Sequence, residues 1–162
     1  MDQYRVFGNP IKQSRSPYIH QQFALATNQE LSYQAEQVAL GGFENTVRDF
    51  MASGGKGANI TVPFKEQAKD LCDELSESAK LAGAVNTLSF FKGRVIGDNT
   101  DGLGLVQDLL NHDVVLKGAN ILMLGAGGAA RGVIFPLLEQ EPETITIANR
   151  TVPKAEQLCL QF

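Results

Sequence analysis

The chain has 162 residues, of which 43% are hydrophobic and 20% are charged, an ordinary composition for a globular protein. Its formal net charge of −4 argues against nucleic-acid or membrane-surface binding. No apolar run reaches the roughly 18 residues of a membrane span, and residues 1–10 lack a signal-peptide pattern. Two histidines and two well-separated cysteines, Cys72 and Cys159, cannot build a metal cluster, so we expect no metal site. We expect reduced cysteines and a cytoplasmic protein.

Short strand and helix patterns alternate between residues 4 and 97. In chain order the sequence predicts a strand at 4–7, a helix at 17–27, a strand at 32–38, a helix at 43–52, a strand at 58–62, a helix starting near Pro63 and another at 76–81. A hairpin comes next, with strands at 86–91 and 94–97 that turn at Lys92-Gly93. This alternation predicts an α/β fold with a largely parallel sheet.

The pattern changes after Asp101. The sequence then predicts a connecting helix at 103–111, a break at Gly118, a strand at 120–124, a glycine-rich turn into a helix, a strand at 144–148 and a helix starting near Pro153. Pro136 should kink the helix after the glycines or end it early. A domain boundary therefore falls within residues 101–118. The βαβα unit beyond this boundary is about half of a dinucleotide-binding sheet, which has roughly six strands.

The glycine-rich turn is the strongest chemical signal in the sequence. Gly125-x-Gly127-x-x-Ala130 follows a hydrophobic strand and opens a helix, the context of a dinucleotide-binding turn. Gly125 allows the tight turn, Gly127 lets backbone N–H groups approach a pyrophosphate, and Ala130 keeps the helix close to the strand. The alternative is a plain strand-to-helix turn.

The end of the next strand indicates which dinucleotide binds. An NAD enzyme usually places a carboxylate there, about 20 residues past the glycines. This chain has Asn149-Arg150-Thr151 instead, and a guanidinium suits a ribose 2′-phosphate. NADP(H) is therefore the predicted cofactor, although Arg150 can also be a solvent-exposed residue at a strand end.

Polar residues at four places mark the first part of the chain and its junction with the second. Ser14 and Ser16 precede Pro17, where Ser16 can be a helix N-cap. Asn59 and Thr61 share one face of a strand, which is typical of a polyol-binding wall or of a solvent-exposed edge. Lys65 stands at a helix start, where its charge opposes the helix dipole. Asp101 also begins a helix, where capping is an alternative to a functional role.

Together these segments resemble the shikimate dehydrogenase family, and the resemblance covers the whole chain. The motifs that carry it, in the family's order, are Gly8-Asn9-Pro10-Ile11, Ser14-x-Ser16-Pro17 with His20, Gly57-x-Asn59-Ile60-Thr61-Val62-Pro63-Phe64-Lys65, Gly83-Ala84-Val85-Asn86-Thr87, Asp98-Asn99-Thr100-Asp101-Gly102, Gly125-Ala126-Gly127-Gly128-Ala129-x-Arg131 and Asn149-Arg150-Thr151. Gln21 departs from the asparagine that is commoner there.

The resemblance implies the roles of individual residues. Shikimate would be held by Ser14, Ser16, Asn59, Thr61, Asn86 and Asp101, and Lys65 and Asp101 would form the catalytic pair. NADP(H) would be bound by Glu77, Gly125, Ala126, Gly127, Gly128, Ala129, Asn149, Arg150, Thr151 and Lys154. The implied reaction is the reversible NADPH-dependent reduction of 3-dehydroshikimate to shikimate, which belongs to aromatic amino-acid biosynthesis.

The implied architecture is a three-layer substrate-binding domain at 1–101, a connecting helix at 102–118 and the first half of a Rossmann-type NADP-binding domain at 119–162. Later strands and helices of the family would lie beyond Phe162, so we expect the chain alone to be weakly active or inactive. Uncovered apolar faces predict self-association, as a homodimer or by domain swapping. Two alternatives stay open: a quinate/shikimate dehydrogenase paralogue, and a non-catalytic module that binds NADP or shikimate.

Overall fold

The computed structural model describes residues 1–162, which divide into two compact units. The first unit comprises Met1–Ser76 and Ala84–Asp98, and the second comprises Glu77–Gly83 and Asn99–Phe162. Both units combine helices with strands, so the predicted α/β class is confirmed. None of the helices has the length and apolar character that crossing a membrane requires.

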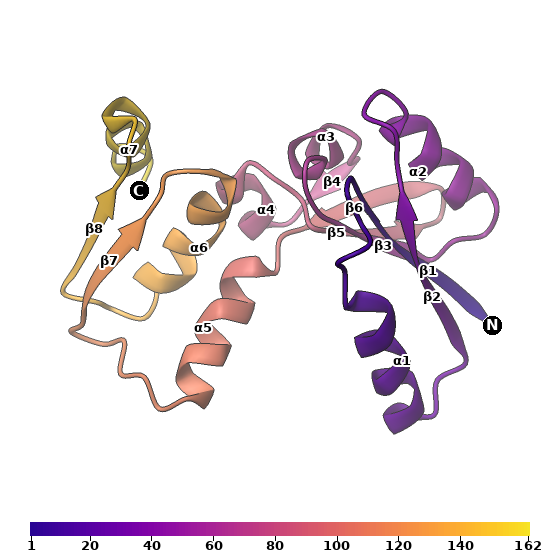
Figure 1. The fold of residues 1–162 in the computed structure, drawn as a ribbon, viewed down its shortest axis with the longest axis horizontal. Helices are drawn as coiled ribbons and strands as arrows, with labels where there is room; N and C mark the ends of the chain where they lie inside the picture. Colours follow the sequence, from indigo (N-terminus) through magenta and orange to yellow (C-terminus); the bar gives the residue numbers. More distant parts are fainter. The chain divides into compact units, whose positions relative to one another are not determined.

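The first unit is built on a six-stranded sheet in the order β2-β1-β3-β5-β6-β4 (Figure 1). Its elements are β1 (Asp2–Gly8), α1 (Ser16–Thr27), β2 (Leu31–Gln37), α2 (Phe43–Ala52), β3 (Gly57–Ile60), α3 (Lys65–Asp70), β4 (Glu74–Leu75), β5 (Thr87–Phe91) and β6 (Arg94–Asp98). Strands β2, β1 and β3 are parallel, whereas β5 runs antiparallel to both β3 and β6. Strand β4 is parallel to β6, so β5 alone runs against the other five strands. The sheet is therefore mixed but largely parallel, and the prediction of a largely parallel sheet is confirmed.

Helices cover both faces of this sheet and give the unit three layers. The ring of His20 on α1 stacks on Tyr33 of β2 with a centroid distance of 4.1 Å. On the opposite face, Phe50 of α2 meets Phe7 of β1 edge to face at 5.8 Å. Most of the large buried side chains lie on this second face, where aromatic packing stabilises the unit.

The predicted hairpin turn is confirmed in its backbone. Lys92 and Gly93 both have positive φ, at 49° and 79°, as a two-residue hairpin turn requires. The peptide bonds Asn9-Pro10 and Val62-Pro63 are cis.

The second unit contains α4 (Glu77–Ala82), α5 (Asp101–Asn111), β7 (Asn120–Leu124), α6 (Gly128–Leu138), β8 (Thr144–Ala148) and α7 (Val152–Cys159). Strands β7 and β8 have the predicted bounds and lie side by side in parallel (Figure 1). Helix α6 continues through Pro136 to Leu138 rather than ending before it. A core of Val106, Leu116 and Leu137 packs against Ile121, Met123 and Ile145, which alternate with exposed residues on the strands.

Candidate active site

The loops that follow β1 and β3 are tied together where these parallel strands end. The Asn9 backbone N–H donates to the Val62 carbonyl oxygen at 3.0 Å, and its side-chain Nδ2 donates to the Val38 carbonyl oxygen at 2.8 Å. Gly8 lets the loops approach, because a Cβ there would lie 2.5 Å from Cγ2 of Thr61. Ligands of open α/β sheets bind outside the carboxyl ends of parallel strands. The predicted residues Asn59 and Thr61 are therefore held at a favourable edge.

Asn59 and Asn86 lie next to each other although they are far apart in sequence. The Ile60 backbone N–H donates to the Asn86 carbonyl oxygen at 2.7 Å, and Asn59 Nδ2 reaches the same oxygen at 3.4 Å. Thr87 Oγ1 donates to Asn86 Oδ1 at 2.8 Å. Asn86 is only 8% exposed, so its amide is held in a largely dry position.

Ser14 and Ser16 form a local turn at the start of α1. The Ser16 backbone N–H donates to Ser14 Oγ at 3.3 Å. The N-cap is Arg15, and α1 has no side-chain cap, so the prediction that Ser16 is the N-cap was wrong by one residue. The Ser16 side chain instead interacts with the Tyr33 hydroxyl. Burial raises the pKa of Tyr33 above its ordinary value, and the interaction with Ser16 partly opposes that rise.

Lys65 is the first residue of α3, and its backbone contacts the residue that precedes Asn86. The Val85 backbone N–H donates to the Lys65 carbonyl oxygen at 2.8 Å. Hydrogen bonds thus join Ser14 with Ser16 and Asn59 with Asn86. Lys65 and Thr61 of the same unit are placed by backbone hydrogen bonds, to Val85 and Phe7. A hollow of about 320 Å³ on the α1 face is lined by Asn59 from this set, together with Tyr4, His20, Tyr33, Lys56 and Thr87.

Asp101 belongs to the second unit, where it is the first residue of α5. Its backbone N–H donates to Asn99 Oδ1 at 3.1 Å, and Asn99 is 3% exposed. The N-cap is Thr100, without a side-chain cap, so Asp101 is not the capping residue of α5.

The glycine turn leaves room above the start of α6. Gly125 has a φ of +113°, which favours glycine, and its N–H donates to the Ala148 carbonyl oxygen at 2.8 Å. A Cβ added at Gly125, Gly127 or Gly128 would meet nothing within 4 Å. Helix α6 has no side-chain cap, and the first N–H groups of a helix lack partners within it. This end can therefore receive a pyrophosphate.

The segment after β8 is attached to the glycine turn through Asn149. The Ala126 backbone N–H donates to Asn149 Oδ1 at 3.3 Å, and Asn149 Nδ2 donates to the Thr151 carbonyl oxygen at 2.7 Å. Arg150 and Lys154 are exposed near this turn, as a phosphate site requires.

Glu77 is exposed at the start of α4. Helix α4 packs on α6. The two come close at Gly83, where an added Cβ would lie 3.2 Å from Nη1 of Arg131.

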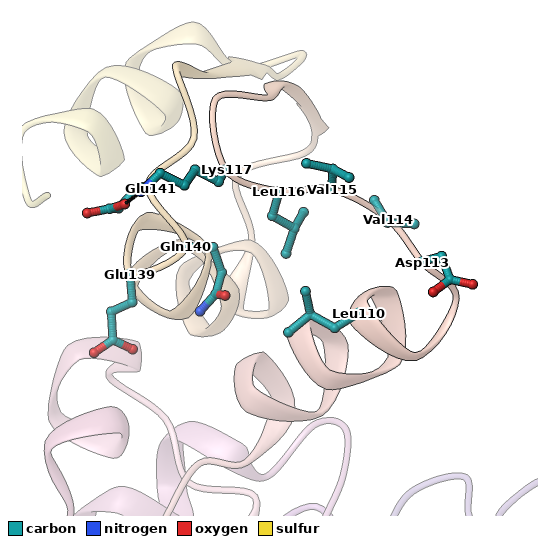
Figure 2. A pocket seen from close by; sticks show the side chains of 9 residues that line it. All are labelled: Leu110, Asp113, Val114, Val115, Leu116, Lys117, Glu139, Gln140 and Glu141. Atoms are coloured by element: carbon teal, nitrogen blue, oxygen red, sulfur yellow. Dashed lines mark hydrogen bonds and ion pairs between the residues drawn. The ribbon is translucent and has the colours of Figure 1, made fainter.

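The largest hollow described in the second unit lies apart from these predicted residues. Its volume is about 650 Å³, and it lies between the end of α5 and the turn after α6 (Figure 2). Figure 2 shows the Lys117 side chain reaching Glu141, with which it forms an exposed ion pair, while Leu110 and Leu116 supply apolar wall. None of the predicted site residues lines this hollow.

Comparison with known proteins supplies the family. The family model for the shikimate dehydrogenase substrate binding domain matches residues 6–88, and the model for shikimate / quinate 5-dehydrogenase matches residues 105–162. The chain belongs to the shikimate dehydrogenase family. Shikimate dehydrogenase (NADP(+)) of Colwellia psychrerythraea is 60% identical over 99% of this chain. The chain spans 58% of the length of that relative.

Solved structures of the shikimate dehydrogenase fold superpose closely. An Ael1 enzyme from Pseudomonas putida matches 99% of the chain with a TM-score of 0.96 and 46% identity, over 60% of its own length. Shikimate 5-dehydrogenase from Thermus thermophilus, in complex with NADP(H) and shikimate, matches 99% of the chain with a TM-score of 0.93 and 35% identity, again over 60% of its length.

Sequence reasoning missed Tyr33 and gave Thr87 no role of its own. Tyr33 Oη donates to Asn59 Oδ1 at 2.6 Å, and Asn59 Nδ2 donates to Thr87 Oγ1 at 3.2 Å. The available signal was weak, since Tyr33 appears in the sequence only as one residue of an ordinary strand pattern.

The two cysteines are unpaired, and burial, with a smaller contribution from Asp73, raises the pKa of Cys72 to about 11. A thiol with so high a pKa is a poor nucleophile.

Proposed function

We propose that this chain carries the substrate site and the opening part of the cofactor site of an NADP-dependent shikimate dehydrogenase. The reaction would be the reversible reduction of the 3-keto group of 3-dehydroshikimate to the hydroxyl of shikimate. In this proposal residues 1–101 form the substrate-binding domain, 102–118 the connecting helix, and 119–162 the first part of the NADP-binding domain. The observation that carries it is the hydrogen-bonded group of Asn59, Asn86 and their neighbours, which presents amides and hydroxyls to a polyol.

The substrate would be held by groups that match its polar atoms. Amide and hydroxyl side chains both donate and accept hydrogen bonds, which suits the hydroxyl groups and the carboxylate of shikimate. Ser14, Ser16, Asn59, Thr61, Asn86 and Asp101 would make these contacts. A site built to bond substrate hydroxyls discriminates strongly against analogues that lack them, because its own buried polar groups are then left unpaired.

Lys65 and Asp101 would transfer the proton. NADPH, when bound, supplies the hydride. The Lys65 ammonium would donate a proton to the oxygen as negative charge develops there, and in the reverse direction the amine would accept it. Asp101 would accept hydrogen bonds from Lys65 and from the reacting hydroxyl, which orients both groups.

NADP rather than NAD is proposed because of the chemistry after β8. Glu77 and residues Gly125 to Ala129 would surround the pyrophosphate and nearby groups at the start of α6. Asn149, Arg150, Thr151 and Lys154 would hold the adenosine ribose with its 2′-phosphate, for which a planar guanidinium is a matched donor. The exposure of Arg150 and Lys154 near the glycine turn supports this assignment.

The test combines binding with turnover. Calorimetric titrations of the chain with shikimate and with NADP⁺ should each show saturable binding, and formation of NADPH from both together should be followed spectroscopically. In a full-length version of the protein, Lys65→Ala should reduce kcat by about 10²-fold or more while shikimate affinity changes far less. Lys69→Ala, on the same short helix and paired with Asp70, is the matched control and should behave like the unaltered chain. Retained turnover in Lys65→Ala would contradict the catalytic role.

Quinate is the second candidate substrate, because the family model that matches residues 105–162 is described for both acids. Parallel titrations with shikimate and quinate would separate the two, and a tighter fit for quinate would replace the substrate proposed above. Binding of both ligands without turnover would identify the chain as a binding module.

A cytoplasmic location is supported by its unpaired cysteines.

A further inference from the structure

A row of hydrogen bonds crosses the α1 face of the first unit's sheet. It begins at Tyr33 on β2, whose hydroxyl donates to Asn59 Oδ1 on β3 at 2.6 Å. Asn59 Nδ2 donates to Thr87 Oγ1 at the start of β5 at 3.2 Å. Thr87 Oγ1 in turn donates to Asn86 Oδ1 at 2.8 Å. The two ends of the row are therefore joined through the amide of Asn59.

Tyr33 reaches Asn59 across an intervening strand. Strand β1 lies between β2 and β3, so the hydrogen-bonded side chains of Tyr33 and Asn59 together span two strand spacings of about 4.8 Å each. Its register partner on β1 is Tyr4, and its ring is held by the stacked ring of His20 at 4.1 Å with an interplanar angle of 5°. The hydroxyl thus arrives at Asn59 from a side chain whose ring is already fixed.

These bonds set the orientation of the Asn59 amide. Asn59 accepts from Tyr33 through Oδ1 and donates through Nδ2 to Thr87 Oγ1 and to the Asn86 carbonyl oxygen. The two hydroxyls can each donate or accept, but a carbonyl oxygen only accepts, so a flipped amide would turn Oδ1 toward an atom that has no hydrogen to donate. Asn86 accepts from Thr87 through Oδ1 at 2.8 Å. The Asn59 amide is therefore held in one orientation, between Tyr33 on one side and Thr87 on the other.

We infer that Tyr33 and Thr87 are positioning residues that hold the amides of Asn59 and Asn86 in the orientation that binds substrate. Neither residue needs to touch the substrate; each acts through a neighbouring amide. This inference rests on the proposed function, because it takes Asn59 and Asn86 as substrate-binding residues.

Tyr33→Phe tests the inference by removing one hydroxyl and retaining the ring that stacks on His20. The variant should bind shikimate roughly fivefold to tenfold more weakly in calorimetric titration, as expected for one lost hydrogen bond. Tyr4→Phe is the matched control: Tyr4 lines the same hollow from the neighbouring strand, and its hydroxyl makes no hydrogen bond within the protein. It should bind shikimate like the unaltered chain.

A second readout reports the amide itself and needs no ligand. The side-chain NH₂ signals of Asn59 in a nitrogen-15 NMR spectrum should move in Tyr33→Phe and stay in place in Tyr4→Phe. Thr87→Val, which keeps the side-chain shape, should move the signals of both Asn59 and Asn86 and also weaken shikimate binding. Thr87→Val provides the test if Tyr33→Phe fails to fold.

The outcomes separate this inference from the proposed function. Shikimate binding that is equally tight in the unaltered chain, Tyr33→Phe and Thr87→Val overturns the positioning role and leaves the proposed function standing. Absence of shikimate binding by the unaltered chain overturns both together. Weaker binding with unmoved Asn59 signals shows that the effect does not pass through the amide, and it also overturns the inference.

Discussion

Helices α5 and α6 of the second unit approach each other at Gly102, next to the proposed catalytic Asp101. A Cβ built on Gly102 would lie 2.4 Å from the backbone oxygen of Gly132 and 2.6 Å from Cγ of Pro136. The first distance is about 1 Å short of ordinary van der Waals contact, which begins near 3.4 Å. Because the obstacle is backbone, Gly102→Ala must move one helix rather than one flexible side chain.

The magnitude depends on two opposing contributions. Overpacking a well-packed site costs typically 1–3 kcal/mol, and contact with backbone places this substitution at about 3 kcal/mol. Replacing glycine by alanine within a helix recovers about 1 kcal/mol. Gly102→Ala should therefore lower the free energy of unfolding by about 2 kcal/mol, which lowers the thermal midpoint of a chain this long by roughly 4–8 °C.

Gly104 is the matched control two residues along the same helix. A Cβ there would meet nothing within 4 Å, so Gly104→Ala should gain helix propensity without a clash. Its thermal midpoint should rise by roughly 2–4 °C. Circular dichroism melts of both variants provide the measurement. A midpoint for Gly102→Ala at or above that of the unaltered chain would refute the packing argument.

Three further predictions concern charge, pH and association. Arg150→Gln should weaken NADP⁺ binding at least roughly tenfold and leave NAD⁺ binding unchanged in calorimetry; an equal loss for both cofactors would contradict the 2′-phosphate assignment. Burial lowers the pKa of His20 below 6.5, so the unfolded chain takes up the proton more readily and stability should fall as pH drops below 6.5. His20→Phe should flatten that fall in thermal midpoints while His112→Phe should not, and identical profiles for the two variants would argue against burial of His20 as the cause. Leu124 is 81% exposed on β7, so the chain should self-associate and Leu124→Lys should lower its sedimenting mass; unchanged sedimentation would show that this face is not involved.

Local patterns predicted the elements of the second unit well. The apolar run at Asn120–Leu124 and the alternation at Thr144–Ala148 gave both strands their bounds. The glycine turn was predictable because the backbone conformation of a tight turn requires glycine at particular positions. The positive φ of Gly125 confirms this. Local rules were less reliable at helix starts: Ser16 has the right chemistry for an N-cap, yet α1 begins one residue earlier than that assignment allows.

Nonlocal pairing was beyond the reach of these patterns. The two-residue strand β4 is too short for any periodicity, and its pairing with β6 depends on contacts made elsewhere in the sheet. The antiparallel pairing of β5 with β3 likewise cannot be read from either strand alone. The bond from Tyr33 to Asn59 crosses a third strand, so it emerges only once the strand order is known.

The most direct test of the account is a crystal structure of this chain with shikimate and NADP⁺. We expect shikimate to lie against Asn59 and Asn86, with the Lys65 Nζ and the Asp101 carboxylate both within about 3.2 Å of the same substrate hydroxyl. Shikimate bound away from the two amides, or a lysine and an aspartate that contact different parts of the ligand, would contradict the proposed dehydrogenase site.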